Sequence, residues 1–415
     1  MKVLVIGSGG REHALASALQ RDPALTELHV APGNPGIAAI AQCHAIDINK
    51  NDQILDLAQQ LNIDLVVVGP EAPLVNGAAD VLRTAGIACF GPSQAAAQLE
   101  GSKDFAKQVM RDAGVPTAKS FTCTSREEVE KALDAFGAPY VVKHDGLAAG
   151  KGVVVTDDRD AAIEHALQSP RVVIEEFLDG PEVSLFGISD GRTVIAMQPA
   201  QDFKRAYDGD AGPNTGGMGA YSPLHWAPSD IIEETLDRVL NPTVKEMAAR
   251  DTPFIGLLYA GLAVTSRGTK VIEFNARFGD PETEVLLPRL KTPLAMLLYK
   301  AATRGLTDDM TLDWSDDSAV TVVLASEGYP ASPKVGEPIM GLDSVKTAQV
   351  FHAGTTSKDG IVHSSGGRVL AVTGMGADLT IARDAAYSAI SQITLHGSHY
   401  RRDIALNAAV AEKGN

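Results

Sequence analysis

Cysteine and long apolar runs are scarce in this sequence. Its three cysteines, Cys43, Cys89 and Cys123, are widely separated among 415 residues and form no CxxC or Cys/His spacing, so they are expected to be reduced core residues. No stretch of 18 uncharged apolar residues occurs, and the apolar run at residues 3–6 is too short for a secretory signal. We therefore expect a cytoplasmic protein that is neither exported nor inserted into a membrane.

Positive charge is also in short supply. The chain has 36 Lys and Arg against 52 Asp and Glu, a formal charge of -16, so its average field repels phosphate polyanions. Broad nucleic-acid binding is excluded on this ground, and any bound phosphate must be held by a local group of residues. The 45% hydrophobic content is ordinary for a globular protein, and the length predicts two to four domains.

The first hundred residues alternate short β-branched runs with helical stretches. This rhythm is typical of βαβ units and predicts a mostly parallel sheet. The expected strands cover residues 3–6, 28–31, 65–68 and 87–90, and the expected helices cover 12–21, 54–61 and 78–85. Each strand ends in a turn rich in glycine or proline, so four loops are expected to meet at one edge, where such sheets bind ligands.

The pattern changes twice after residue 102. Strands and a helix around a glycine-rich loop indicate an α+β lid. Two later hairpins indicate an antiparallel sheet. The last strands and the last helix indicate a C-terminal domain. The expected strands are 140–143, 153–156, 172–177, 183–188, 193–197, 261–265, 270–274, 320–325, 349–352 and 368–373, with helices at 102–113, 158–168, 231–249 and 378–393.

These changes predict a multidomain protein of mixed α/β and α+β class. The expected parts are an N-terminal parallel α/β (Rossmann-like) domain at 1–102, a central domain at 103–118 and 190–316, a lid at 119–189 and a C-terminal α+β domain at 317–415.

The turn at residues 7–12, GSGGRE, follows the first expected strand and starts a helix. Free backbone N–H groups and the helix dipole make an anion site there. Glu12 stands where a dinucleotide fingerprint has its third glycine, and Pro32 stands where a ribose-binding acid is expected. A single phosphate, held with Arg11, therefore fits better than NAD; the alternative is a tight turn with Arg11 on the surface.

Residues 146–152, GLAAGKG, resemble a phosphate loop but break the Walker pattern, with Gly150 too early and a glycine after Lys151. The loop joins two expected strands, which suits a flap that closes over phosphates, or a plain hairpin. Lys143, inside the preceding apolar strand, needs an anion because an unpaired buried ammonium is costly. That anion is a nucleotide phosphate or an internal carboxylate such as Glu175.

Carboxylates gather at the ends of two other expected strands. Glu176 ends one strand and Glu182 follows its turn, where a carboxylate can bind ribose hydroxyls or simply be solvated. Glu273 and Asn275 share one face of a later strand and offer two oxygen ligands for Mg²⁺. Arg277 follows, with carboxylates beside it, and can grip a substrate carboxylate, although pairing among these charges is the alternative.

Together these segments resemble the ATP-grasp superfamily and, within it, the phosphoribosylamine–glycine ligase family, over essentially the whole chain. The most specific strings are residues 9–14, 69–74, 145–153, 212–223 and 277–284. The resemblance implies an ATP-grasp lid and central domain and the coupling of glycine to 5-phosphoribosylamine through a glycyl phosphate, in purine biosynthesis. The implied cofactors are ATP with Mg²⁺ or Mn²⁺. Composition leaves a monomer and a weak dimer both open.

The resemblance also implies roles for individual residues. ATP is expected to contact Lys103, Lys143, Gly150, Lys151, Glu175, Glu176, Leu178 and Glu182, and the metal Glu273 and Asn275. Catalysis is assigned to Asp202, Lys204, Arg277 and Asp280. Substrate binding is assigned to Gly9, Gly10, Arg11, Glu12, Asn34, Pro70, Glu71, Asn214 and Thr215. The activated species is a substrate carboxylate, so charge stabilisation and orientation are expected to replace a protein nucleophile.

Two residues depart from the family pattern. His144 stands where Ala is usual and is expected to point away from Lys143 and alter packing only. Phe203 stands where a His usually follows the residue matching Asp202, which removes a titratable group from that loop. The strand near Gly261 also lacks the extra metal carboxylate of many ATP-grasp relatives.

Three other functions stay as alternatives. The strings at 212–223 and 277–284 argue against a different ATP-grasp ligase or carboxylase. Glu12 and Pro32 argue against a nicotinamide oxidoreductase. The intact lysine and metal positions argue against a non-catalytic nucleotide sensor.

Overall fold

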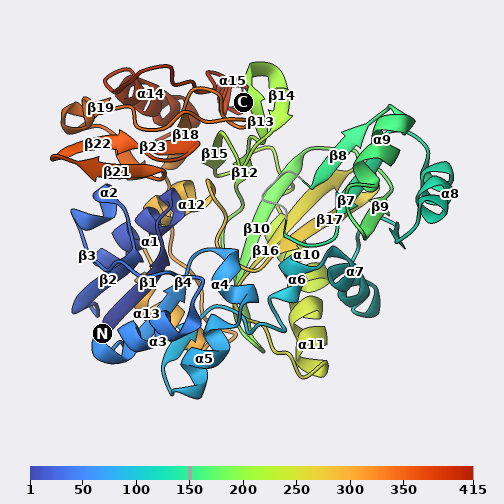
Figure 1. Ribbon diagram of the computed structural model, residues 1–415, viewed down its shortest axis with the longest axis horizontal. Coiled ribbons are helices and arrows are strands. Elements are labelled where there is room, and N and C mark those ends of the chain that lie inside the picture. Colours follow the sequence, from blue (N-terminus) through green and yellow to red (C-terminus); the bar gives the residue numbers. More distant parts are fainter. Residues whose placement is uncertain (148–151, 415) are drawn as a thin grey trace.

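The computed structural model describes residues 1–147 and 152–414. Its N-terminal part is a five-stranded parallel sheet in the order β3-β2-β1-β4-β5 (Figure 1). The sequence predicts the parallel arrangement and four of these strands, but not β3. The strands are β1 Lys2–Gly7, β2 Glu27–Pro32, β3 Gln42–Cys43, β4 Leu65–Val68 and β5 Ala88–Phe90, and the helices are α1 Gly10–Gln20, α2 Pro35–Ala38, α3 Asn51–Gln60, α4 Glu71–Val75, α5 Ala78–Thr84 and α6 Gln98–Gly101. The apolar runs of β1 and β4 are buried because helices cover both faces.

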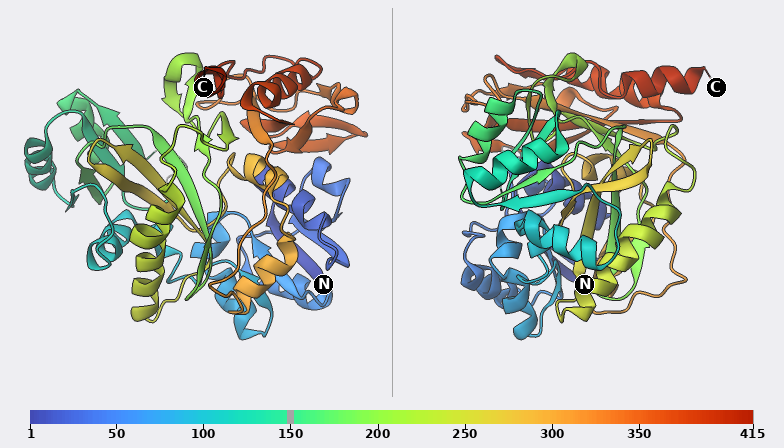
Figure 2. Two further views of the ribbon diagram at one scale, coloured as in Figure 1. Left: turned by 180° about the vertical axis from the view of Figure 1, so that it is seen from behind. Right: turned by 90° about the vertical axis from the view of Figure 1, so that its right-hand side faces the viewer.

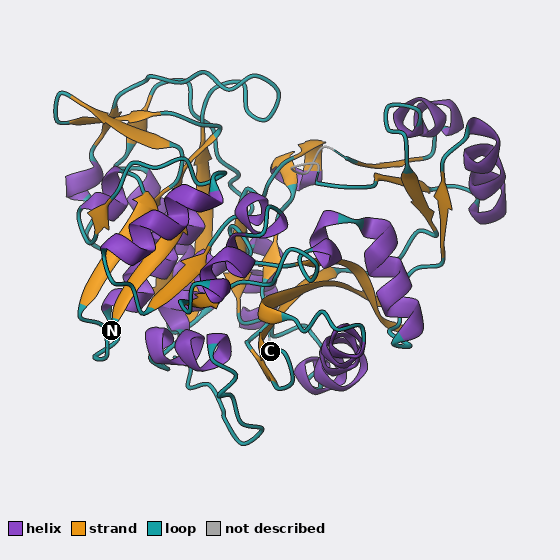
Figure 3. Ribbon diagram, turned by 60° about the horizontal axis from the view of Figure 1, so that its bottom comes forward, coloured by secondary structure: helices purple, strands orange, loops and turns teal. Residues whose placement is uncertain are grey.

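Helix α7, Lys103–Asp112, leads into a lid built on a four-stranded antiparallel sheet in the order β6-β9-β7-β8. Its elements are β6 Ser120–Cys123, α8 Arg126–Phe136, β7 Tyr140–His144, β8 Val153–Thr156, α9 Arg159–Ala166 and β9 Val172–Glu175. The lid forms the end of the molecule opposite the N-terminal sheet (Figure 2, Figure 3). Strand β9 stops at Glu175, two residues before the predicted end, because its partner β6 begins at Ser120, opposite Glu175.

The central part is an antiparallel sheet in the order β11-β10-β16-β17. Its strands are β10 Glu182–Asp190, β11 Val194–Ala196, β16 Ile255–Thr265 and β17 Gly268–Asn275; a small hairpin, β13 Arg205–Tyr207 and β14 Ala211–Asn214, encloses the 3-10 turn Asp208–Asp210. The helices are α10 Ile231–Thr235, the π-helical turn Leu236–Leu240, α11 Asn241–Ala249, α12 Thr283–Arg289 and α13 Leu294–Ala302. Both predicted hairpins of this sheet are present.

The C-terminal sheet has the order β12-β15-β18-β23-β20. It contains β18 Ser318–Ala325, β20 Gln349–His352 and β23 Arg368–Gly376, with two strands from earlier in the chain, β12 Gln201–Asp202 and β15 Gly219–Ser222. The other elements here are β19 Ile339–Met340, the 3-10 turn Leu342–Ser344, β21 Thr355–Lys358, β22 Ile361–Ser364, α14 Leu379–Ile390, β24 Thr394–Leu395 and α15 Leu406–Lys413. Asp378 caps α14, as the sequence predicts.

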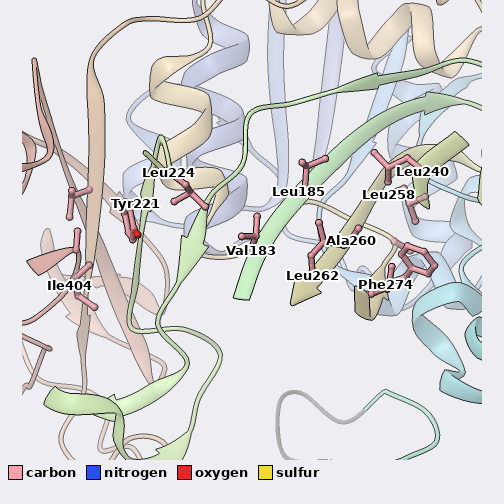
Figure 4. Close-up of a cluster of buried hydrophobic side chains, with 14 of the residues drawn as sticks. Val183, Leu185, Tyr221, Leu224, Leu240, Leu258, Ala260, Leu262, Phe274 and Ile404 are labelled. Carbon is pink, nitrogen blue, oxygen red and sulfur yellow. The ribbon is translucent and has the colours of Figure 1, made fainter. Parts of the chain in front are cut away.

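One hydrophobic core continues from the central sheet into the C-terminal sheet (Figure 4). It runs from Leu185 and Leu258 of the central strands to Tyr221 of β15 and Ile404 near the C-terminus. The lid instead packs around a core of its own, so few apolar contacts tie it to the rest. Within the described residues, no helix is long and apolar enough to cross a membrane.

Candidate active site

A cavity of about 1690 Å³ opens between the lid, the central sheet and the N-terminal domain. The expected site residues that line it are Arg11, Pro70, Glu71, Lys103, Lys143, Glu175, Glu176, Leu178, Glu182, Asp202, Lys204, Asn214, Thr215, Glu273, Asn275, Arg277 and Asp280. The fold thus brings together side chains that are up to 269 positions apart, since Arg11 and Asp280 share one cavity.

Several expected residues are placed differently. Among the described residues, Gly9, Gly10, Glu12 and Asn34 do not line this cavity. Gly150 and Lys151 lie outside the residues that the structure describes, so the flap assigned to them stays a prediction.

Glu12 fills the start of α1, where the sequence predicts an anion site. Its Oε2 accepts the Gly9 N–H at 2.6 Å and its Oε1 accepts Arg11 Nε at 2.5 Å. A Cβ atom on Gly7, which has φ +131°, would lie 2.5 Å from the Glu12 side chain, so this glycine makes room for it. Arg11 is buried, so the alternative of a surface Arg11 is wrong. Glu12 already supplies one negative charge to the helix start.

Asn34 connects three segments of the chain. Its Oδ1 accepts the Ile37 N–H and caps α2, while its Nδ2 donates to the carbonyls of Ser8 and His352, both at 2.8 Å. The amide is buried and fixes the loop after β1 against strand β20. These bonds favour a positioning function, and the expected substrate contact stays a prediction.

Lys143 has an internal carboxylate partner. Its Nζ lies 2.9 Å from Oε2 of Glu175 and donates to the Ile272 carbonyl at 3.0 Å. Lys107 Nζ lies 2.9 Å from the other oxygen of Glu175. Burial alone lowers the pKa of Lys143, but the Glu175 carboxylate outweighs it and raises that pKa above its ordinary value. Sequence reasoning missed Lys107; its position one turn after Lys103 was the available signal.

Lys103 and Glu176 both line the cavity. Lys103 Nζ donates to the Gly146 carbonyl at 3.0 Å, and burial lowers its pKa. Glu176 Oε1 accepts Lys270 Nζ at 3.0 Å and the Lys119 N–H at 3.1 Å. Because β9 has ended, the chain after Glu176 leaves the sheet and lines the cavity.

A second cluster of charges surrounds Lys204. Its Nζ lies 2.5 Å from Oε2 of Glu182 and 3.2 Å from Oδ1 of Asp202. Burial raises the pKa of Asp202 to about 7; Lys204 opposes this shift, and the negative charges of Glu282 and Glu182 add to it. Thr215 Oγ1 donates to the Lys204 carbonyl at 2.9 Å, which fixes the two strands of this loop together.

Glu273 and Asn275 lie on one face of β17, as the period-two spacing predicts. Within residues 1–147 and 152–414, no hydrogen-bond or ion-pair partner of the Glu273 carboxylate is found. Gly261 stands opposite Glu273 in the register and leaves that face open. Asn275 Oδ1 accepts Arg277 Nη2 at 3.3 Å. A charged oxygen and an amide oxygen facing the same cavity fit a hard divalent cation.

Arg277 and Asp280 are each held by a partner that the sequence did not reveal. Arg277 Nη2 lies 3.1 Å from Oε1 of Glu100, and its Nε lies 3.6 Å from Oε2 of Glu71. Asp280 Oδ1 lies 3.0 Å from Arg368 of the C-terminal sheet. Glu100 and Arg368 carry no motif, so only their placement in the fold identifies them.

The two departures from the family pattern have defined surroundings. His144 stacks on His165, with ring centroids 4.1 Å apart, on the opposite face of β7 from Lys143. This agrees with a packing function for His144. Phe203 lies under the buried guanidinium of Arg401, whose Cζ is 4.9 Å from the ring centroid. Phe203 thus holds a cation in place by its ring face, where a histidine would bring a titratable group.

Three models of one family match most of the chain. The N domain of phosphoribosylglycinamide synthetase matches residues 1–100, its ATP-grasp (A) domain residues 101–283 and its C domain residues 319–407. A phosphoribosylamine–glycine ligase of Streptomyces coelicolor is 63% identical over 99% of this chain and 100% of its own length. One from Leifsonia xyli is 55% identical over 98% of this chain and 100% of its own.

Solved structures agree with this match. The phosphoribosylamine–glycine ligase of Thermotoga maritima has a TM-score of 0.84 at 32% identity and covers 97% of this chain and 100% of its own. A biotin carboxylase domain from Hydrogenobacter thermophilus has a TM-score of 0.71 at 17% identity, covering 96% and 91%, which shows a shared fold alone.

An antiparallel lid and a central sheet that enclose a lysine- and carboxylate-lined cavity define an ATP-dependent ligase of the ATP-grasp class. Within that class, the chain belongs to the phosphoribosylglycinamide synthetase family.

Proposed function

We propose that this protein ligates glycine to 5-phosphoribosylamine at the expense of ATP and releases glycinamide ribonucleotide, ADP and phosphate. The observation that carries the proposal is the single cavity shared by residues of the N, A and C domains. In this reaction a glycine carboxylate oxygen attacks the γ-phosphorus of ATP and ADP leaves. The ribosylamine nitrogen then attacks the acyl carbon, phosphate leaves, and the nitrogen loses a proton.

The lysines of the lid and of α7 support a place for ATP. Lys143 and Lys107 share the Glu175 carboxylate, so these three side chains together carry one positive charge, which attracts phosphates. Glu182 and the chain around Leu178 line the cavity as well and are assigned to the ribose and the base. Gly150 and Lys151 are assigned to the flap that covers the phosphates.

Glu273 and Asn275 would hold Mg²⁺, with Mn²⁺ as the second candidate, because hard cations prefer oxygen donors. The ion would neutralise charge on the phosphates of ATP. Arg277 and Asp280 would orient glycine, and Asp202 and Lys204 would lie beside the reacting groups.

Phosphoribosylamine is assigned to the edge of the N-terminal sheet. Arg11, Pro70 and Glu71 line the cavity from the N-terminal domain, and Asn214 and Thr215 line it from the central part. This edge would be shaped by residues that do not line the cavity themselves, namely Gly9, Gly10, Glu12 and Asn34. We place the reaction in the cytoplasm, where thiols stay reduced, and infer a monomer or weak dimer with small-molecule partners only.

ADP release tests the proposal directly. Purified protein with Mg-ATP would receive glycine and freshly generated phosphoribosylamine singly and together. ADP formation that requires both substrates supports the ligase. Nucleotide binding without turnover, in the presence of an acceptor shown to be intact, would contradict it and favour another carboxylate substrate or a nucleotide sensor.

A further inference from the structure

Glu282 is a buried carboxylate that lines the cavity beside Asp202 and Arg277. Its Oε1 accepts the hydroxyl of Tyr259 at 2.6 Å and that of Ser184 at 3.0 Å. The two hydroxyl oxygens are themselves 2.7 Å apart, so the three side chains are in mutual contact. The carboxylate is therefore fixed in position by donors that carry no charge.

Among the described residues, no cation pairs with this carboxylate. Across residues 1–147 and 152–414, no lysine, arginine or histidine nitrogen lies within ion-pair distance of Glu282. The cations of this region are engaged with other carboxylates: Lys204 with Glu182 and Asp202, Arg277 with Glu100 and Glu71, and Arg368 with Asp280. A buried charge without a partner is costly, so its presence beside a cavity indicates a cationic group supplied from outside the protein.

The second oxygen of Glu282 lies against the backbone of Gly279. A Cβ at position 279 would lie 2.5 Å from Oε2, so only glycine leaves space for the carboxylate there. The negative field of Glu282 also reaches Asp202, where it adds to the effect of burial in raising the pKa. The charge of Glu282 also acts on the Arg277 guanidinium. An anion and a cation that interact with each other therefore both line the cavity.

Arg277 keeps a buried Nε without a hydrogen-bond acceptor among the described residues. Glu282, which has no cationic partner among the described residues, lines the same cavity as the Arg277 guanidinium, and this pair of opposite charges is complementary to a small zwitterion. We propose that Glu282, held by Tyr259 and Ser184, binds the ammonium group of the amino-acid substrate and selects it over carboxylates that lack this group. This inference rests on the proposed function and assigns its substrate specificity to one side chain.

The test compares glycine with glycolate, in which a hydroxyl replaces the ammonium. Glu282→Gln keeps the shape and the hydrogen bonds to Oε1 but removes the charge. We expect the KM for glycine to rise about 30-fold or more, because a buried charge pair is lost, whereas the Ki of glycolate changes less than about threefold. The KM for ATP should likewise change less than about threefold.

A merely structural Glu282 would raise the glycine KM and the glycolate Ki by the same factor, which would overturn the proposal. An increased Mg²⁺ requirement with unchanged glycine KM would also overturn it and make Glu282 a metal ligand. Glu327→Gln, an exposed carboxylate paired with Lys334, is the matched control and should leave every constant unchanged.

Glu282→Asp covers the case in which the glutamine variant does not fold. It keeps the charge but withdraws it by one methylene, so the glycine KM should rise at least about fivefold with the glycolate Ki unchanged. Equal changes in both constants would overturn the proposal. Absence of turnover in the unaltered protein would instead contradict the proposed function itself, so the two failures are distinguishable.

Discussion

Lys143 and Glu175 form an ion pair with Nζ 2.9 Å from Oε2, and each side chain is only 4% exposed. Lys107 reaches the other oxygen at 2.9 Å. Two ammonium groups, one from α7 and one from β7 of the lid, thus share one carboxylate. These three side chains carry one net positive charge beside the cavity, although the chain as a whole has a formal charge of -16.

Glu175→Gln should lower the free energy of unfolding by about 3–5 kcal/mol, because it leaves two buried ammonium groups without their carboxylate. The lysines hold the pKa of Glu175 below its usual range, although burial opposes them. The stabilisation should therefore be complete above the ordinary glutamate range and be lost as pH falls through the lowered pKa. Urea unfolding at several pH values measures this. Glu127→Gln, in an exposed pair, is the control, and equal losses in the two variants would contradict the prediction.

Asp202 should contribute a pH dependence of stability opposite in sign to that of Glu175, and Asp202→Asn should remove it. The pKa of Asp202 rises from 3.8 to about 7, chiefly through burial, so the folded state keeps a proton that the unfolded state has lost. Stability should fall as pH rises from 3.8 to about 7, and the asparagine variant should lose this part of the slope. Melting temperatures over this range test it; an unchanged slope in the variant would rule out this titration.

Glu273→Ala should abolish metal-dependent turnover and leave the fold intact. The substitution removes a cavity-lining oxygen donor and no core volume. ADP release at increasing Mg²⁺ and a melting curve provide the two readouts. Turnover near that of the unaltered protein, with normal melting, would refute the metal assignment.

Arg11→Ala should raise the KM for phosphoribosylamine more than the KM for ATP. Arg11 lines the cavity from the N-terminal domain, whereas Lys143 lines it from the lid. The change also leaves the buried Glu12 carboxylate without its guanidinium partner, so a lower melting temperature is expected as well. Equal increases in the two KM values would count against a separate phosphate site.

Phe203→His should weaken the contact with Arg401. The guanidinium carbon lies 4.9 Å from the Phe203 ring centroid, and such a contact contributes about 0.5–2 kcal/mol. A protonated imidazole would also repel the guanidinium, so the loss should grow below the ordinary histidine pKa. A double-mutant cycle with Arg401→Met, followed by urea unfolding, measures the coupling. Additive effects of the two substitutions would show that the ring and the guanidinium do not interact.

Local patterns in the sequence were sufficient for much of the architecture. The runs at 3–6 and 65–68, each followed by a glycine turn, predict parallel strands because burial on both faces selects continuous β-branched segments. The spacing of Glu273 and Asn275 predicts their shared face because side chains alternate along any strand. The specific strings at 212–223 and 277–284 were sufficient to indicate the family.

The membership of the sheets and the partners of the charges were decided by the tertiary structure alone. Strands β12 and β15 join the C-terminal sheet although more than 90 residues separate β15 from β18. Glu12 turns inward as a helix cap. Glu282 has no cationic partner within residues 1–147 and 152–414, because Lys204, Arg277 and Arg368 pair with other carboxylates. Strand periodicity and turn chemistry act over a few residues, so a sequence displays them. Charge compensation depends on which distant side chains are buried together, and only the folded chain sets that.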